Sequence, residues 1–284
     1  MTALSPERVA VLGAGNIGAA LIGGMLKAGV TTPDRLRATV RTEEHAADLA
    51  RKYGITVTAG ENARAVESAD LVILAVKPTT LPSVLGEIRA ALHTGQLLIS
   101  LAAAFPIALI ERLIDRPGLA VARAMPNIPV VVDEGATGIA TNASATASHK
   151  ALVESVFRPV GVVCFVDEDL LHAVTAMSGS GPAYIYMVIE GLVAAGLKMG
   201  LSHAVSTRLA EQTVLGAAKL VRETGLHPAI LRDQVITPGG VTISAVHELE
   251  KHGLRSMLIS AIETATHHSR HLTKTLLAKF DTDS

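Results

Sequence analysis

Three glycines that follow a short apolar run form the first candidate site. Gly13, Gly15 and Gly18 come directly after Val9–Leu12, a run typical of a buried strand, and they open an apolar helical pattern. The first glycine suits a tight turn, the second lets the backbone approach a pyrophosphate, and the third lets the helix pack close to the strand. Free N–H groups at the helix start would stabilise that anion. The order of strand, turn and helix predicts a dinucleotide site, whereas isolated glycines would indicate only a turn.

The tip of the second predicted strand indicates which dinucleotide would bind. An NAD site usually has an acidic residue there to bind the ribose hydroxyls, but this chain has Arg41 and Thr42. Arg41 could pair with a 2′-phosphate, and Thr42 could donate its hydroxyl. Glu43 and Glu44 follow directly and weaken this argument, although they also fit as favourable charges in the first turn of a helix. We therefore expect NADP as the cofactor, with NAD as the alternative.

Two further glycine-containing loops could approach a ligand closely. Segment 238–242, with sequence PGGVT, precedes an amphipathic helical pattern, so its free N–H groups could bind a carboxylate beside the Thr242 hydroxyl. An ordinary helix start is the alternative for this loop. Segment 178–182, with sequence SGSGP, is expected to form a turn that opens a long apolar helix, with Pro182 at the first helical position. No spacing to a His or Asp marks either serine of this turn as a nucleophile.

The elements that must position these loops alternate regularly in the first part of the chain. Strand-like apolar runs occupy Val9–Leu12, Leu36–Val40, 55–57, 71–76, 97–101 and 119–122. The intervals between these runs fit crossover helices, which predicts a doubly wound, Rossmann-like α/β domain. Two later runs, 136–141 and 161–166, flank a helical pattern near 145–157 and should add strands.

The second part of the chain has a different rhythm. From about Asp167 onward no strand-like run is bounded by turns, and Gly200, Gly225 and Gly253 divide helical patterns from one another. We therefore expect a dinucleotide-binding domain over residues 1–166. An all-α dimerisation and substrate domain should follow over residues 167–284.

One predicted helix of this second domain is apolar on nearly every side. Between residues 183 and 199 the only charged residues are Glu190 and Lys198. A helix of this kind must be buried all round, and a domain of this size has difficulty burying it alone. We expect a homo-oligomeric interface of intertwined helices, since such interfaces resemble a core cut in half. The alternative is a central helix surrounded by its own neighbours.

Composition and charge exclude several classes of function. The 284 residues are 49% hydrophobic with a net charge of −1 and seven aromatic residues, so neither a basic surface nor base-stacking rings indicate nucleic-acid binding. The long uncharged runs at 9–26, 90–110 and 170–189 are interrupted by glycine, proline and polar residues, which argues against a membrane span. Residues 1–8 lack the pattern of a secretion signal.

Cysteine and histidine usage points to a cytoplasmic protein without metal. Cys164 is the single cysteine and lies in an apolar run, so we expect a buried, inert thiol and a reduced compartment. His267, His268 and His271 include an i,i+4 pair, but no acidic third ligand shares their helix face. These histidines are interpreted as a solvated helix face, and we expect no metal site.

Taken together, the motifs resemble the pyrroline-5-carboxylate reductase family, whose members catalyse the last step of proline biosynthesis. The resemblance covers nearly the whole chain. It rests on the glycine turn 13–18, Ala75-Val76-Lys77-Pro78, Met125-Pro126-Asn127, Ser178-Gly179-Ser180-Gly181-Pro182-Ala183-Tyr184, the PGGVTISAVHELE segment 238–250, and Gly253-Leu254-Arg255-Ser256. It implies a Rossmann-like domain followed by a helical dimerisation domain, with dimers that assemble further in some members.

The resemblance also assigns cofactor contacts residue by residue. It places them at Leu12, Gly13, Ala14, Gly15, Asn16, Ile17, Asn62, Ala75, Val76, Lys77, Pro78, Leu101, Ala102 and Ala103. The glycine motif itself adds Gly18, and the strand tip adds Arg41 and Thr42.

The expected reaction is hydride transfer from NAD(P)H to the C=N carbon of 1-pyrroline-5-carboxylate, which gives L-proline. The resemblance places the substrate between two groups of residues: Ser178, Gly179 and Ser180, and Gly239, Gly240, Val241 and Thr242. It implies that the second loop comes from the partner subunit, with Thr242 at the ring nitrogen. We expect the substrate carboxylate on the N–H groups of Gly240, Val241 and Thr242, and we expect Thr242 to be the catalytic residue.

Three residues depart from the family pattern, and two other functions remain as alternatives. His172 stands where the family often has an acid, Ile128 replaces a usual Thr, and Ala104 replaces a common Gly.

One alternative function is that of a reductase of another imine or of a carbonyl on the same scaffold. The other is a regulatory protein that binds the cofactor without turnover, although such a protein would not need the two substrate loops.

Overall fold

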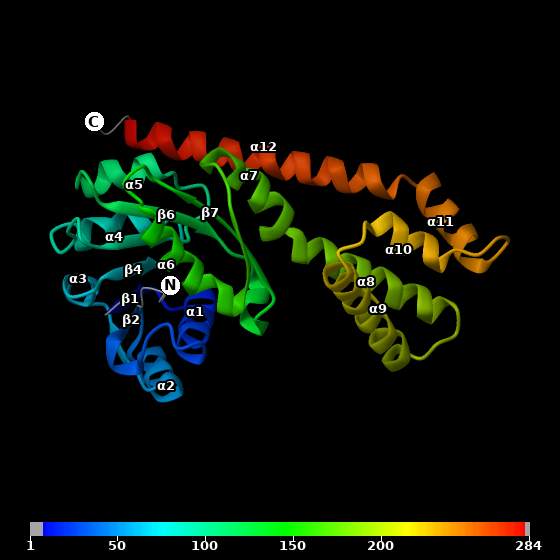
Figure 1. The fold of residues 1–284 in the computed structure, drawn as a ribbon, viewed down its shortest axis with the longest axis horizontal. Coiled ribbons are helices and arrows are strands. Elements are labelled where there is room, and N and C mark those ends of the chain that lie inside the picture. The colour runs from blue at the N-terminus through cyan, green and yellow to red at the C-terminus, as the bar shows by residue number, and fades with distance from the viewer. Residues whose placement is uncertain (1–7, 282–284) are drawn as a thin grey trace. The chain divides into compact units, whose positions relative to one another are not determined.

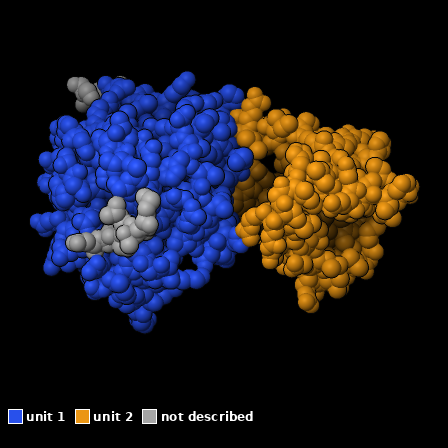
Figure 2. Space-filling view, viewed as in Figure 1, with its two compact units in different colours: residues 1–180, 265–284 blue, residues 181–264 orange. Residues whose placement is uncertain are grey.

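The computed structural model describes residues 8–281, and the chain divides into two compact units. Unit 1 comprises residues 1–180 and 265–284, and unit 2 comprises residues 181–264 (Figure 2). The segment 1–7, within the region where the sequence indicates no secretion signal, lies outside the described residues.

Unit 1 is built on an eight-stranded sheet with the order β3-β2-β1-β4-β5-β6-β7-β8 (Figure 1). The strands are β1 (Val9–Leu12), β2 (Leu36–Val40), β3 (Thr56–Ala59), β4 (Leu71–Leu74), β5 (Leu97–Ser100), β6 (Ala120–Met125), β7 (Gly135–Thr141) and β8 (Gly161–Phe165). Strands β1 to β6 are parallel, β7 is antiparallel to β6, and β8 is parallel to β7. This arrangement confirms the predicted Rossmann-like fold.

Helices cover both faces of this sheet and explain why β1 and β4 are apolar at every position. The helices are α1 (Asn16–Lys27), α2 (Glu43–Tyr53), α3 (Asn62–Glu67), α4 (Leu81–Ile88), α5 (Ile107–Ile114), α6 (Ala147–Phe157) and α7 (Leu171–Val174), with short 3-10 turns at Pro33–Arg35, Ile128–Val132, Arg158–Val160 and Glu168–Leu170. Alternate residues of β4 enter different cores: Leu71 and Ile73 pack with α1, α2 and α6, whereas Val72 and Leu74 pack with α3, α4 and α5. A strand buried on both faces needs apolar residues at every position.

The expectation that Cys164 is buried is wrong. Cys164 is exposed, as are Val162 and Phe165 on the same strand. Strand β8 is the last in the sheet and pairs with β7 only, so within residues 8–281 part of its apolar surface is left exposed.

The expectation of a simple turn at 178–182 is also wrong. Helix α7 continues into a π-helical turn, Thr175–Gly179, in which the N–H of Ser180 donates to the carbonyl of Thr175 at 2.8 Å. The next helix, α8, begins at Gly181. Single π turns of this kind are rare and occur frequently at functional sites.

Unit 2 is entirely helical in its described residues, as the sequence predicts. It contains α8 (Gly181–Lys198), α9 (His203–Thr224), α10 (Pro228–Val235), α11 (Val241–Lys251) and the first part of α12 (Leu254–Asp281). Ser202 is the N-cap of α9, where its hydroxyl accepts from the Val205 N–H, and Gly225 ends the same helix in the left-handed conformation. Helix α8 approaches α9 closely, because a Cβ at Gly196 would lie 2.5 Å from the Ser206 hydroxyl.

The compact units divide the chain at different positions from the expected boundary between residues 166 and 167, which remains a prediction. Helix α7 packs against β7 so closely that a Cβ at Gly138 would lie 2.7 Å from Val174. The second half of α12 returns to unit 1, where Phe280 meets Phe105 edge to face with ring centroids 6.3 Å apart. These long-range contacts attach both segments to the sheet domain.

The helical stretch Glu168–Lys198 is long and apolar enough to cross a membrane by length and composition, with a mean hydropathy of 1.3 in its best window. It contains the π turn and α8, whose apolar character the sequence analysis assigns to a subunit interface. Length and composition do not separate these two interpretations, so the absence of a membrane span stays a prediction.

A buried polar cluster fixes α12 to unit 1. The ring Nδ1 of His172 lies 2.9 Å from the Ser269 hydroxyl, and both residues are buried. Arg123, only 3% exposed, pairs with Glu168 at 3.1 Å. Burial lowers the pKa of His172, and the nearby charges of Arg123 and Arg270 lower it further, while Asp169 and Glu168 oppose the shift. The folded environment of His172 therefore favours the neutral imidazole over the charged form.

The state of His172 predicts a pH dependence of stability. As pH falls, the unfolded chain takes up a proton at His172 near its ordinary pKa of about 6.5, whereas the folded chain takes it up only at a lower pH. The free energy of unfolding should therefore fall as pH drops below about 6.5. His172→Gln keeps a hydrogen-bonding group near Ser269 but removes the titration. Urea unfolding between about pH 7 and pH 5 should therefore give a flatter pH profile for His172→Gln than for the wild type. The exposed His203, changed to Gln, is the control and should keep the wild-type profile. Parallel profiles for wild type and His172→Gln would contradict this account.

Candidate active site

The residues expected to bind the cofactor follow strands that end at one edge of the sheet. The register pairs Leu12 with both Thr39 and Leu74, and it pairs Leu74 with Ser100, so β2, β1, β4 and β5 end side by side. The backbone bonds continue past the strand ends: the Ala75 N–H donates to Leu12 at 2.8 Å. The chain order reverses at β1, which has β2 on one side and β4 on the other. Ligands of doubly wound sheets bind at such a switch point, beyond the carboxyl ends of the strands.

The glycine turn at this edge leaves no room for side chains where the chain packs and open space where a ligand would lie. Gly13 has φ +81°, and a Cβ there would lie 2.5 Å from Val76. A Cβ at Gly18 would lie 3.2 Å from the Cβ of Ala75, whereas a Cβ at Gly15 would meet nothing within 4 Å. The turn therefore has a tight first position, an open second position and a close-packed third position. Helix α1 begins directly after it, so the first-turn N–H groups face the same edge.

A hollow of about 330 Å³ opens beside this turn. It is lined by Gly13, Ala14, Gly15, Val40, Arg41, Thr42, His45, Ala75, Val76, Lys77 and Thr80. Sequence reasoning named most of these residues but missed Val40, His45 and Thr80. His45 lies in the first turn of α2, directly after the strand tip that carries Arg41, and this position was the signal available for it.

The strand tip supplies a free cation and a hydroxyl to this hollow. Among the described residues Arg41 has no ion-pair partner, and its side chain is exposed. Thr42 is the N-cap of α2: its oxygen accepts from the His45 N–H at 3.3 Å, which leaves the hydroxyl hydrogen available to a ligand. Glu43 and Glu44 lie in the first turn of α2, where acidic side chains interact favourably with the helix dipole.

Other expected cofactor residues lie at the same edge but do not line the hollow. Leu12 is fully buried, and residues 101–103 follow β5. The Asn62 side chain is already engaged: its Oδ1 accepts from the Thr39 hydroxyl and its Nδ2 donates to Glu87, both at 2.7 Å. Asn62 therefore ties α3 to the end of β2 and to α4. Asn16 and Ile17 open α1, and Pro78 follows Lys77 at the rim.

The expected substrate residues lie in different units. Residues 178–180 belong to unit 1, where the Ser178 hydroxyl donates to the Val174 carbonyl at 3.0 Å and a Cβ at Gly179 would lie 2.9 Å from Met125. Residues 239–242 belong to unit 2 and lead into α11. The structure describes each group within its own unit.

The loop before α11 corrects one expected contact. The N–H of Gly240 donates to the carbonyl of Thr237 at 3.0 Å, so it is not free to bind a substrate carboxylate. A Cβ at Gly240 would lie 2.2 Å from the Thr237 hydroxyl, which explains the glycine at this position. Gly240 is the N-cap of α11, so Val241 and Thr242 are its first two helical residues, and their N–H groups have no helical acceptor. The expected anion site therefore has two available N–H donors, those of Val241 and Thr242, and not three.

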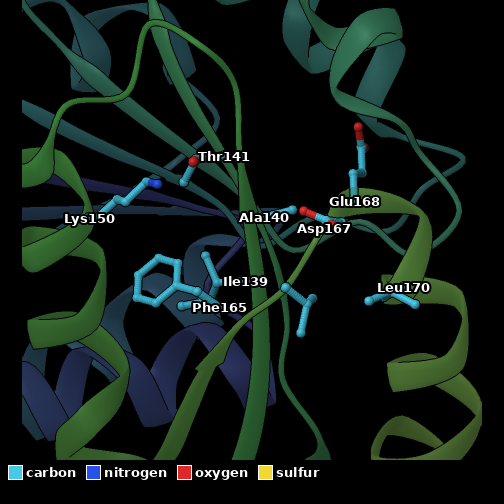
Figure 3. Close-up of a pocket in the computed structure, with 9 residues that line it drawn as sticks. Ile139, Ala140, Thr141, Lys150, Phe165, Asp167, Glu168 and Leu170 are labelled. Carbon is cyan, nitrogen blue, oxygen red and sulfur yellow. The ribbon is translucent and has the colours of Figure 1, made fainter.

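A second hollow, of about 520 Å³, lies away from the switch point (Figure 3). Its lining residues are Ile139, Ala140, Thr141, Lys150, Phe165, Val166, Asp167, Glu168 and Leu170, and none was among the expected site residues. Figure 3 shows Lys150 extending from α6 toward Thr141 on β7. Glu168 has a structural role, because one of its carboxylate oxygens accepts hydrogen bonds from both the Ile107 N–H and the Arg123 side chain. Several expected cofactor residues instead line the hollow at the switch point, beside the start of α1.

No group of three His, Cys, Asp or Glu side chains that could hold a metal ion occurs within residues 8–281. The sequence expectation of no metal remains a prediction.

Comparisons with known proteins identify relatives of both parts of the chain. A family model described as pyrroline-5-carboxylate reductase dimerisation matches residues 168–272, and one described as NADP oxidoreductase coenzyme F420-dependent matches residues 8–104. The pyrroline-5-carboxylate reductase of Methanosarcina acetivorans is 41% identical over 94% of this chain and 98% of that protein. The one from Arabidopsis thaliana is 36% identical over 94% and 96%, respectively.

Solved structures of two such reductases resemble the whole fold. The structure from Coxiella burnetii has a TM-score of 0.89 at 35% identity, over 94% of this chain and 98% of that one. The structure from Plasmodium falciparum, with NADP bound, has a TM-score of 0.82 at 28% identity over the same shares of the two chains.

Proposed function

Because the chain belongs to the pyrroline-5-carboxylate reductase family, it is an oxidoreductase that reduces 1-pyrroline-5-carboxylate to L-proline, and we propose that NADPH is its reductant. The observation that carries this proposal is the hollow at the switch point. It brings the glycine turn, Arg41, Thr42 and Lys77 together around one space.

The residues at this edge fit a dinucleotide with a 2′-phosphate. We assign the pyrophosphate to the start of α1, where Gly15 leaves open space and the N–H groups of the first turn are available. Arg41 and Thr42 would bind the 2′-phosphate through charge-assisted hydrogen bonds. When bound, the cofactor supplies a hydride to the C=N carbon of the substrate. The NADP oxidoreductase family model and the relative solved with NADP support this choice over NADH.

The proposed role of the protein toward the substrate is to bind and orient it. A protonated imine is already a strong electrophile, so the site needs position and exclusion of water more than a strong acid. The substrate carboxylate would lie on the N–H groups of Val241 and Thr242 at the start of α11. The Thr242 hydroxyl would hydrogen-bond the ring nitrogen, which orients the C=N bond and holds the proton at that nitrogen.

The exposed apolar surface of α8 supports a homodimer. Its exposed side chains include Ile185, Tyr186, Met187, Val188, Leu192 and Leu197. The family model that matches residues 168–272 is a dimerisation model, and its start supports the boundary that we expect between residues 166 and 167. We propose that a second copy covers α8, that residues 238–242 of that copy complete the active site, and that the enzyme works in the cytoplasm.

The direct test of this function is turnover of the purified chain. With NADPH and 1-pyrroline-5-carboxylate, the absorbance of the reduced nicotinamide should fall and L-proline should form in equal amount. Cofactor binding without turnover would favour a regulatory role. Turnover of other cyclic imines or of carbonyl compounds, but not of this imine, would assign another substrate to the scaffold.

Arg41 should decide the cofactor preference. Arg41→Ala removes the cation at the proposed 2′-phosphate position, so KM for NADPH should rise about tenfold to a hundredfold, while KM for NADH should stay nearly unchanged. Arg51→Ala is the matched control, because Arg51 is an exposed arginine of α2 that does not line the hollow. Equal losses with both cofactors would defeat the assignment.

Thr242 should affect the rate more than binding. Thr242→Val keeps the shape and the backbone N–H but removes the hydroxyl, so kcat should fall by about 10²-fold, as for a positioned donor removed from a dry site. Thr242→Ser should recover part of the rate, and NADPH affinity should not change in either variant. A wild-type kcat for Thr242→Val would show that the hydroxyl has no catalytic role.

A further inference from the structure

Asn127 links three segments at the carboxyl edge of the sheet. It follows β6 and is only 8% exposed. Its Oδ1 accepts from the Ala136 N–H on β7 at 2.8 Å, and its Nδ2 donates to the Ser178 carbonyl in the π turn at 2.9 Å. Both ends of one buried amide are thus used to join the end of β6, the start of β7 and the π turn.

The Ser178 carbonyl needs this donor because of the residue four positions later. In a regular α-helix the carbonyl of residue 178 would accept from the N–H of residue 182. Residue 182 is a proline and has no N–H to donate. Nδ2 of Asn127 supplies the missing donor from outside the helix, and an unpaired carbonyl at this half-buried position would be unfavourable.

Other contacts shape the π turn, but Asn127 provides its hydrogen bond to the end of β6. The Ser178 hydroxyl bonds within the helix to Val174, and the Ser180 N–H bonds to Thr175, so both bonds are internal to the helical segment. A Cβ at Gly179 would lie 2.9 Å from the end of the Met125 side chain, so the backbone of Gly179 lies close to that side chain. Strand β6 is parallel to β5, so Asn127 lies at the same edge as residues 101–103 and the cofactor turn.

We propose that Asn127 is a positioning residue that sets the place of residues 178–180 relative to the cofactor edge. This inference rests on the proposed function, in which those residues lie against the substrate. Both ends of the Asn127 amide are engaged by protein groups, so we assign it no direct bond to substrate or cofactor. Without the Nδ2 donor of Asn127, residues 178–180 shift along the edge and the C=N carbon of the substrate is less well aligned with the nicotinamide. The cofactor hollow keeps its shape.

Asn142 offers a matched control at the opposite end of the same two strands. Its Oδ1 accepts from the Val121 N–H at 3.0 Å, and its Nδ2 donates to the Leu119 carbonyl and to Glu111, both at 2.8 Å. It therefore satisfies backbone groups in the same way as Asn127, but beside the start of β6. Asn→Asp at either position keeps the acceptor and replaces the donor with a carboxylate that faces a carbonyl, and at position 142 this carboxylate also faces Glu111.

The test compares Asn127→Asp with Asn142→Asp. Both variants should lower Tm, but only Asn127→Asp should raise KM for 1-pyrroline-5-carboxylate and lower kcat, with a combined loss in kcat/KM of about tenfold to a hundredfold. The Kd for NADPH, from fluorescence titration, should stay within about twofold of the wild type in both. Equal kcat/KM for the two variants would overturn the proposal.

A second variant separates positioning from simple satisfaction of a carbonyl. Pro182→Ala in the Asn127→Asp background restores an N–H at residue 182, so the double variant should recover Tm but not kcat/KM. Recovery of both would show that Asn127 only satisfies the carbonyl, and the proposal would fail. The double variant also supplies a folded protein if Asn127→Asp alone does not fold.

Hydrogen exchange tests the inference without reference to the substrate. Amide exchange in the peptide that covers residues 175–183 should be faster in Asn127→Asp than in Asn142→Asp, even if the wild-type protein does not reduce 1-pyrroline-5-carboxylate. Failure of wild-type turnover would therefore count against the proposed function. Unchanged exchange in this peptide would count against the role of Asn127.

Discussion

The apolar surface of α8 has no core to enter within the described chain, and this constraint shapes the rest of our account. Not one of its residues is buried in the described part of the chain, and Met187 is 69% exposed. Water disfavours such a surface in proportion to its area. A second copy of the same helices is a partner with matching chemistry, and the dimerisation family model covers this region. We infer that the enzyme assembles its active site only when that second copy is present.

In our proposal the two units contribute different parts of the active site. Unit 1 provides a rigid edge, where strand register and backbone hydrogen bonds fix the glycine turn against Ala75 and Val76. Unit 2 provides a short loop and a helix start with two available N–H groups and one hydroxyl, at Val241 and Thr242. Helix α12 runs from unit 2 into unit 1, where the His172–Ser269 bond and the Arg270–Asp169 ion pair hold it.

The sequence predicted what local pattern determines. Apolar runs punctuated by glycine located the strands, and the 13–18 motif placed the turn, because both depend on neighbouring residues. It failed where a distant contact decides. The exposure of Cys164 depends on which strand ends the sheet. The π turn also has a contact that no local pattern reveals, because its Ser178 carbonyl accepts from Asn127, which lies 51 residues earlier. The return of α12 to unit 1 involves the distant contact between Phe105 and Phe280. The miss at Gly240 is of another kind, because its N–H is occupied by a local bond to the Thr237 carbonyl that the motif does not reveal.

A mixing experiment tests the two-copy site most directly. Gly15→Glu places bulk and negative charge at the pyrophosphate position, where a Cβ meets open space, and Thr242→Val disables the substrate loop. If each site combines the cofactor edge of one copy with the loop of the other, coexpression yields mixed dimers with one intact site. Random pairing then restores about a quarter of the wild-type sites, although each variant alone is nearly inactive. Activity of the coexpressed protein no higher than the mean of the separate variants would contradict the shared site and place both parts within one copy.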